Sequence, residues 1–172
     1  DVAYPLVPAR GVSDVREQLQ KLPQADLFGE QAIRDAEMAD CCLSGLWLRF
    51  DFLDESHTIS QSIATSTGSY WHGIMHRREP DWSNAKYWFR KVGNHAIFAD
   101  LPLAASQQAS EFKVNDEATA LMNSKTWDPF AFVDLCQQAH RTGGELESFC
   151  RAVQLAEWDL LFDWCYRQAL GQ

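Results

Sequence analysis

The sequence has few glycines and prolines and no long apolar run. Nine glycines and six prolines among 172 residues are too few for a fibrous or low-complexity chain. No apolar stretch is long enough for a membrane span or for the core of a signal peptide. Because hydrophobic residues still make up 46% of the chain, we expect a folded globular protein with a substantial core.

Basic residues are also scarce. The chain has 15 lysines and arginines against 24 aspartates and glutamates, which gives a net charge of −9. Binding to phosphate groups on nucleic acid or on an anionic membrane requires a basic surface. We therefore expect neither nucleic acid nor a membrane as a partner.

The cysteines do not form a recognisable framework. There are five, an odd number, Cys41 and Cys42 are adjacent, and no CxxC pair occurs. This pattern favours buried reduced thiols over a disulfide scaffold or a thiolate zinc site, and predicts a cytoplasmic location. The chain begins at Asp1 without a methionine or a charged leader, which leaves its native N-terminus open.

Helical periodicity is the strongest structural pattern that is present. Apolar residues recur in steps of three and four over residues 30–53 and again over residues 145–169, which predicts two long helices. Gly45 lies within the first of them, where its low helix propensity is compatible with a close helix crossing.

Shorter helices are predicted between the two long ones, at residues 56–64, 68–79, 82–92, 116–124 and 129–141. Asp128 and Pro129 supply the N-cap and the first position of the last of these. The segment 94–114 has no clear pattern, and no long alternating β pattern occurs. The sequence thus predicts an all-α fold, a single-domain bundle of roughly six to eight helices over residues 1–172, with 1–11 as an extended N-terminal arm.

A helix–turn–helix elbow is predicted at Pro80. A proline disfavours helical geometry at the preceding residue, Glu79, and Asp81 is placed to cap a helix that starts at Trp82. Before the turn, His72, His76 and Glu79 follow one another in steps of four and three. This spacing places the three side chains on one face of the helix.

These side chains suggest a metal site or acid–base chemistry. A His-xxx-His pair followed by a carboxylate can bind a divalent metal such as zinc or iron if other helices add ligands. The candidate metal ligands are His57, His72, His76, Glu79 and His95. His72, His76 and Glu79 are also the candidate catalytic residues, because they are clustered titratable groups that could serve as acid or base at neutral pH. No HExxH, GxSxG, P-loop or GxGxxG pattern is present.

The same stretch also carries positive charge. Five basic residues and only two acidic ones lie between His76 and Lys91. Arginine side chains and a helix N-terminus suit the phosphate or carboxylate group of a small anionic ligand, and aromatic rings can form stacking walls. The candidate ligand-binding residues are Arg77, Arg78, Lys86, Tyr70, Trp71 and Trp88.

Two alternatives stay open at this point. In the first, the histidines hydrogen-bond across the elbow, and Arg77 and Arg78 pair with acids such as Asp51, Asp54 and Glu55, so that the cluster is purely structural. In the second, a tryptophan-rich elbow of Trp71, Trp82 and Trp88 docks a partner chain or a second copy in a homo-oligomer.

The central stretch also resembles a known motif. The segments WHGIMHRREPD, residues 71–81, and SNAKYW, residues 83–88, are similar to a motif in a family of uncharacterised bacterial and fungal proteins. The resemblance covers roughly residues 56–98 and implies that this stretch is one unit. It implies no activity and no cofactor.

Overall fold

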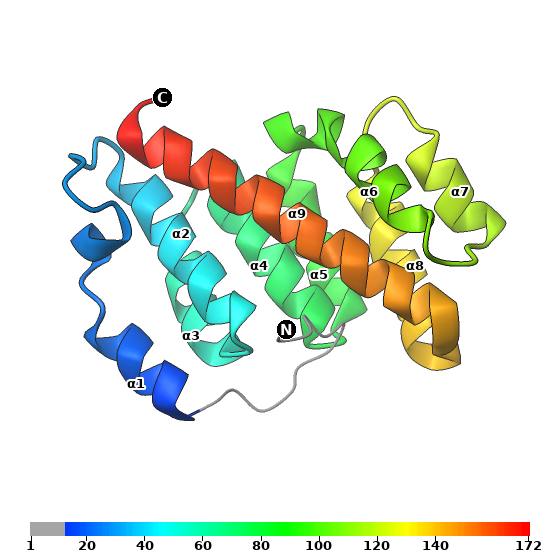
Figure 1. The fold of residues 1–172 in the computed structure, drawn as a ribbon, viewed down its shortest axis with the longest axis horizontal. Helices are drawn as coiled ribbons and strands as arrows, with labels where there is room; N and C mark the ends of the chain where they lie inside the picture. Colours follow the sequence, from blue (N-terminus) through cyan, green and yellow to red (C-terminus); the bar gives the residue numbers. More distant parts are fainter. Residues whose placement is uncertain (1–12) are drawn as a thin grey trace.

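The computed structural model describes residues 13–172 and confirms the all-α prediction (Figure 1). The described part contains nine α-helices and two short 3-10 helices, and no strand. They are α1 (Ser13–Lys21), η1 (Gln24–Leu27), α2 (Ala36–Arg49), α3 (Leu53–Ser60), α4 (Ser66–Arg78), α5 (Trp82–Val92), η2 (Ala96–Ala99), α6 (Leu101–Ala109), α7 (Asp116–Met122), α8 (Pro129–Thr142) and α9 (Gly144–Leu170). The predicted arm at residues 1–11 lies outside the described residues.

Helix α9 is the long element against which the others are arranged. It runs diagonally across the front of the molecule, over α4 and α5, and packs against α2, α6 and α8 (Figure 1). Its apolar side chains contribute to one core that extends from Phe28 to Leu170. The predicted helix at 145–169 agrees with these bounds to within one residue at each end.

The predicted helix at 30–53 is in fact α2 followed by the start of α3. Helix α2 begins only at Ala36, because the carboxylate of Asp35 accepts a hydrogen bond from the backbone N–H of Met38 and caps the helix. It ends at Arg49, and Asp51 has a left-handed backbone conformation with φ of 66°. The apolar spacing continues through this break because Phe50 and Leu53, on the two sides of the turn, are both packed against the core.

The crossing of α2, α4 and α9 is close at Gly45. A Cβ atom at this position would lie 2.8 Å from Cη2 of Trp71, on α4. The indole Nε1 of Trp158, on α9, donates a hydrogen bond of 2.8 Å to the carbonyl oxygen of Gly45. The close crossing expected at this glycine is therefore present, and it brings three helices into contact.

The elbow at Pro80 joins α4 and α5. The side chain of Asp81 caps α5 by accepting a hydrogen bond of 3.1 Å from the backbone N–H of Asn84, and α5 has the predicted bounds of 82–92. Helix α4 packs against α2, α3 and α5, and every residue from 67 to 78 is buried. The histidines and arginines of this stretch thus lie in the interior of the bundle.

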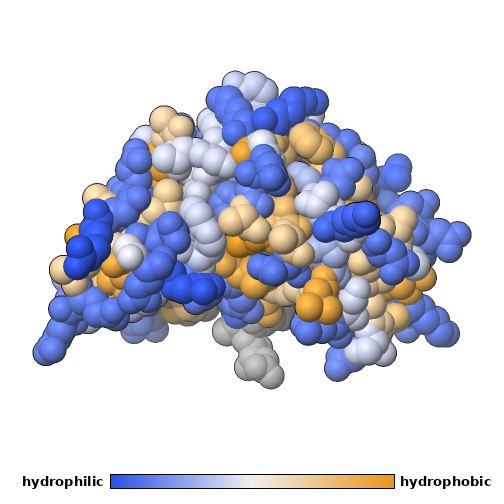
Figure 2. Space-filling model, turned by 90° about the horizontal axis from the view of Figure 1, so that it is seen from above, coloured by the Kyte–Doolittle hydropathy of each residue, from blue (hydrophilic) through white to orange (hydrophobic). Residues whose placement is uncertain are grey.

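The upper face of the molecule is mainly hydrophilic. Figure 2 shows charged and polar residues over most of the upper face, with smaller apolar areas between them. None of the helices in residues 13–172 is both long enough and apolar enough to cross a bilayer. All five cysteines are buried and unbridged.

Candidate functional site

Three histidines from two adjacent helices come together beside the elbow. His57 lies on α3, and His72 and His76 lie one turn apart on α4. One ring nitrogen from each histidine can be chosen so that all three lie within 4.8 Å of one another. The Nε2 atoms of His72 and His76 are 3.0 Å apart, and the ring of His57 lies edge-on to the ring of His72 with centroids 4.5 Å apart. We call these three residues the histidine cluster.

Residues of the elbow and of α5 surround the histidine cluster. The carboxylate of Glu79 lies 3.0 Å from Nδ1 of His76, and the side-chain amide of Asn84 lies 3.0 Å from Nε2 of the same ring. The indole of Trp88 stacks on the ring of His72, with centroids 3.8 Å apart and planes inclined by 22°. The histidine rings are thus held from the elbow side and from α5.

The environment keeps the two histidines of α4 uncharged. Burial, with smaller contributions from the neighbouring His76 and His57, lowers the pKa of His72 to about 3. Burial also lowers the pKa of His76, against the opposing effect of Glu79, which favours the charged form. At neutral pH both rings are therefore neutral imidazoles, each with a lone pair on one nitrogen, and this is the form that binds metals.

Hydrogen bonding within the histidine cluster is incomplete. When Glu79 accepts the proton on Nδ1 of His76 and His72 carries its own proton on Nε2, the single lone pair on Nε2 of His76 faces two donors, from His72 and Asn84, each at 3.0 Å. Meanwhile Nδ1 of His72 is buried and has no partner within residues 13–172. A buried nitrogen without a partner costs roughly 1–3 kcal/mol. The cluster thus has a surplus of donors at one nitrogen and an unsatisfied nitrogen nearby.

Two of the predicted metal ligands lie outside the histidine cluster. Glu79 contacts His76 through Nδ1 and is half exposed, so it orients that ring rather than adding a ligand atom to the group of three. His95 is buried elsewhere, because it caps η2 and its ring packs against Trp164 and lies 3.2 Å from the hydroxyl of Thr67. Burial lowers the pKa of His95 to about 4.

Arg77 and Arg78 have structural contacts in place of the predicted contact with an anionic ligand. Both side chains are fully buried. Arg77 forms an ion pair with Glu157 of α9, and Arg78 forms one with Asp51 and also donates to the carbonyl oxygen of Leu48. A buried guanidinium group that already has a carboxylate partner is not exposed to a ligand. The arginines therefore correspond to the structural-network alternative, with Asp51 as an anticipated partner and Glu157 as an unanticipated one.

Most of the predicted stacking residues belong to the core. The hydroxyl of Tyr70 donates a hydrogen bond of 2.9 Å to Glu157, and the pKa of Tyr70 is raised, first by burial and then by that carboxylate. The indole of Trp71 is fully buried and its Nε1 lies 3.4 Å from Sγ of Cys165. Of Tyr70, Trp71 and Trp88, it is Trp88 that contacts the histidine cluster in the described part of the chain.

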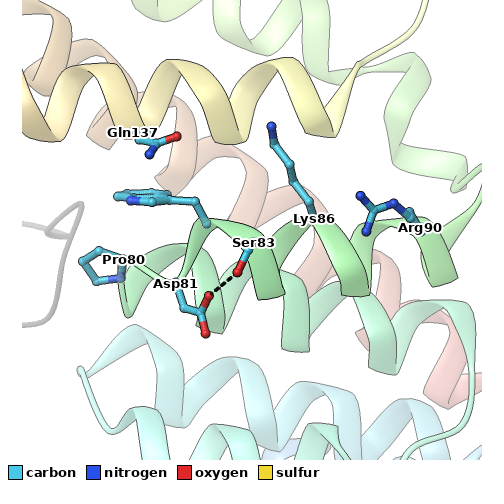
Figure 3. Close-up of a pocket in the computed structure, with 7 residues that line it drawn as sticks. Pro80, Asp81, Ser83, Lys86, Arg90 and Gln137 are labelled. Carbon is cyan, nitrogen blue, oxygen red and sulfur yellow. Dashed lines mark hydrogen bonds between the residues drawn. The ribbon is translucent and has the colours of Figure 1, made fainter.

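Lys86 lines a separate open pocket between α5 and α8 (Figure 3). This pocket has a volume of about 640 Å³ and is lined by Pro80, Asp81, Trp82, Ser83, Lys86, Arg90 and Gln137. The ammonium group of Lys86 is 2.5 Å from a carboxylate oxygen of Asp134, so its charge is already neutralised. The pocket lies on the α8 side of α5, away from the histidine cluster.

Asn84 and Glu157 are the residues of this region that sequence reasoning missed. Asn84 had a local signal, because it lies three residues after the predicted cap Asp81 and therefore on the first turn of α5, at the elbow. Glu157 had a weaker one, as the charged residue on a buried face of α9 that is otherwise mostly apolar.

Comparison with known proteins yields no match to this chain among family models, curated proteins or solved structures. The class of the site therefore follows from its geometry alone, a cluster of three histidines from α3 and α4, two of which are buried.

Proposed function

We propose that this protein binds a divalent transition metal through His57, His72 and His76, and that the bound metal holds a small ligand. The observation that carries the proposal is the convergence of three ring nitrogens within 4.8 Å of one another. Imidazole nitrogen binds zinc, iron, copper and nickel, and zinc–nitrogen distances of about 2.0–2.1 Å suit a tetrahedral site. Zinc is the first metal to test.

The contacts of His76 support this proposal. Ligating histidines usually donate their second ring N–H to a carboxylate, which fixes the tautomer and increases the basicity of the ligating nitrogen. Glu79 has that relation to His76, with 3.0 Å between Oε2 and Nδ1. A metal would also remove the conflict at Nε2 of His76, because it would replace donors that compete for one lone pair.

Three protein ligands leave a coordination position for a small molecule. Structural zinc sites are generally closed by four protein ligands, whereas sites that act on a ligand keep one position for water or substrate. His57 is partly exposed, so the open side faces solvent. When bound there, a metal supplies Lewis acidity and lowers the pKa of coordinated water. This favours a small-ligand-binding protein or enzyme.

The alternative of an interaction module has less support. Trp71 is fully buried, and Trp82 and Trp88 are partly buried. The large hydrophobic side chains that are exposed in the described part are Tyr87 and Leu103. The three tryptophans thus do not form a common exposed patch. The cytoplasmic location stays a prediction.

The test is zinc binding by untagged protein and by a His57→Gln variant. His57 has ring contacts but no side-chain hydrogen bond among the described residues, so replacing it should remove a metal ligand without breaking a polar network. We expect one zinc ion per native chain, a raised unfolding midpoint when zinc is added, and loss of both effects in His57→Gln.

His140→Gln is the matched control, because His140 is an exposed histidine far along the chain on α8. This variant should retain full zinc binding. Absence of stoichiometric metal in the native protein, together with an unfolding midpoint that zinc does not change, would reject the proposal.

A further inference from the structure

A second pocket adjoins the histidine cluster where α3 ends and α4 begins. It has a volume of about 440 Å³ and is lined by Gln61, Ile63, Ala64, Thr65, Ser66, Ser69, Trp88 and Lys91. Ser69 is three residues before His72 on α4, and Gln61 is four residues after His57 at the end of α3. Trp88 lines the pocket and also stacks on His72. The pocket and the histidine cluster thus share one wall.

The electrostatics of this pocket favour an anion. Its lining includes Lys91 and no acidic residue. The ammonium group of Lys91 lies 4.0 Å from the ring centroid of Trp88 and 4.6 Å from that of Tyr87, and it has no carboxylate within ion-pair distance in residues 13–172. In the pocket between α5 and α8, by contrast, Lys86 is paired with Asp134 and Asp81 contributes to the lining. Lys91 therefore has a charge that a ligand can neutralise.

Hydrogen-bond donors lie on the same wall. Ser69 is only 6% exposed, lines the pocket, and its hydroxyl has no hydrogen-bond partner among the described residues. Thr65 and Ser66 form the N-terminus of α4, a helix of 13 residues, where backbone N–H groups and the helix dipole favour negative charge. The unpartnered hydroxyl of this largely buried serine, together with the helix N-terminus and the lysine, makes a set of donors suited to the oxygen atoms of an anion.

We infer that this pocket binds an oxyanion group, a carboxylate or a phosphate, of the small molecule that the metal holds. Lys91 supplies the charge, Ser69 and the first turn of α4 supply donors, and Trp88 forms the wall between the anion and the metal site. The inference rests on the proposed function only where it joins this anion to a molecule held by the metal. The oxyanion pocket itself does not depend on a metal. In this inference Lys91, and not the predicted Arg77 or Arg78, is the cation that binds an anionic ligand.

The experiment measures binding of inorganic phosphate and of acetate to metal-free, full-length protein by calorimetry at low ionic strength. We expect saturable binding, weakened on the order of 10-fold by Lys91→Gln and several-fold by Ser69→Ala, since charge-assisted hydrogen bonds are the stronger ones. Lys125→Gln, which removes the same charge from an exposed lysine, is the matched control and should bind as the native protein does.

The two anions identify the ligand group. Tighter binding of phosphate that strengthens as pH rises through its second ionisation would assign a phosphoryl group, and tighter binding of acetate would assign a carboxylate. No saturable binding of either anion, or equal affinities in native protein and Lys91→Gln, would overturn the inference. So would a loss of binding in Arg90→Gln but not in Lys91→Gln, since Arg90 lines the pocket between α5 and α8.

His57→Gln separates this inference from the metal proposal. The variant should lose zinc and keep anion binding. If the native protein binds the anions but not zinc, the metal proposal is rejected and the oxyanion pocket is retained. If the native protein binds zinc but neither anion, the metal proposal alone is retained.

Discussion

Arg77 of α4 and Glu157 of α9 form an ion pair in which neither side chain has any solvent exposure. The same carboxylate accepts a hydrogen bond from Tyr70, and the guanidinium Nε of Arg77 donates to Gln154 at 3.3 Å. The guanidinium also lies over the ring of Phe132, 4.6 Å from its centroid. One buried charge pair thus ties α4 to α9 and is satisfied from several sides.

Removal of one partner of this pair should be severely destabilising. Arg77→Met leaves the Glu157 carboxylate buried without its cation, and losses of about 3–5 kcal/mol are typical for such changes. Urea denaturation followed by circular dichroism measures the free energy of unfolding. Arg167→Met is the control, because Arg167 and Asp163 form an exposed ion pair on α9. Loss of this exposed pair should change the free energy of unfolding by less than about 1 kcal/mol. Equal effects of the two substitutions would contradict this prediction.

The proposed orienting role of Glu79 gives a prediction for metal affinity. Glu79→Gln keeps a hydrogen-bond acceptor near Nδ1 of His76 but removes the charge, and the loss of such a partner typically lowers metal affinity by about 10–100-fold. Zinc affinity is measured by competition with a chromophoric chelator. Glu111→Gln, at an exposed position, should leave the affinity unchanged. Unchanged affinity in Glu79→Gln would show that this carboxylate does not support the site.

His95 predicts how stability depends on pH. Its pKa is about 4 in the folded protein and 6.5 in the ordinary exposed state, so the unfolded chain takes up the proton first as pH falls. Stability should therefore be unaffected by this group above pH 6.5 and decrease between pH 6.5 and about 4, on the order of 1 kcal/mol per pH unit. Urea denaturation of metal-free protein at several pH values measures the slope.

The control for this slope is a comparison of two variants. His95→Gln lacks the titrating group and should lose less stability on acidification than the native protein. His140→Gln, on the exposed surface of α8, should keep the native slope. Parallel curves for native protein and His95→Gln would contradict the assignment.

Gly45 predicts a steric cost at the crossing of α2 and α4. Alanine is the better helix former by about 1 kcal/mol, but its Cβ would meet the buried indole of Trp71 at 2.8 Å. We expect Gly45→Ala to destabilise the protein by about 1–3 kcal/mol, as overpacked cores generally do. Combining it with Trp71→Leu should cost less than the sum of the two single changes, because the smaller side chain makes room. Additive effects would indicate that the two residues do not compete for space.

Local signals in the sequence predicted local structure well. Asp81 and Pro80 define the elbow because capping and proline geometry depend on adjacent residues alone, and α5 has its predicted bounds. The break between α2 and α3 was missed because the apolar periodicity passes through it. What stops α2 is the left-handed conformation of Asp51, whose carboxylate pairs with Arg78. That pairing depends on a helix more than twenty residues away, and periodicity carries no information about it.

In the candidate site too, relationships within one helix could be predicted from the sequence, and contacts between helices could not. His72 and His76 share a helix face, so their proximity followed from spacing alone. The packing of α3 against α4 brings His57 to these two residues, whereas His95, at the start of η2, packs against Trp164 instead. Both placements depend on tertiary structure. Arg77 and Arg78 are adjacent in sequence yet point to different helices, because successive residues on a helix face directions about 100° apart. Charge alone therefore did not reveal that both are buried.

The continuous burial of residues 67–78 has a kinetic consequence. Backbone amides in the interior of a bundle exchange with deuterium only when the structure around them opens, so those of α4 should be among the slowest in the protein. We expect His57, on the short and partly exposed α3, to lie in a segment that opens more readily than α4. The proposed metal ion would then enter and leave by local opening at α3, while His72 and His76 stay in place on α4.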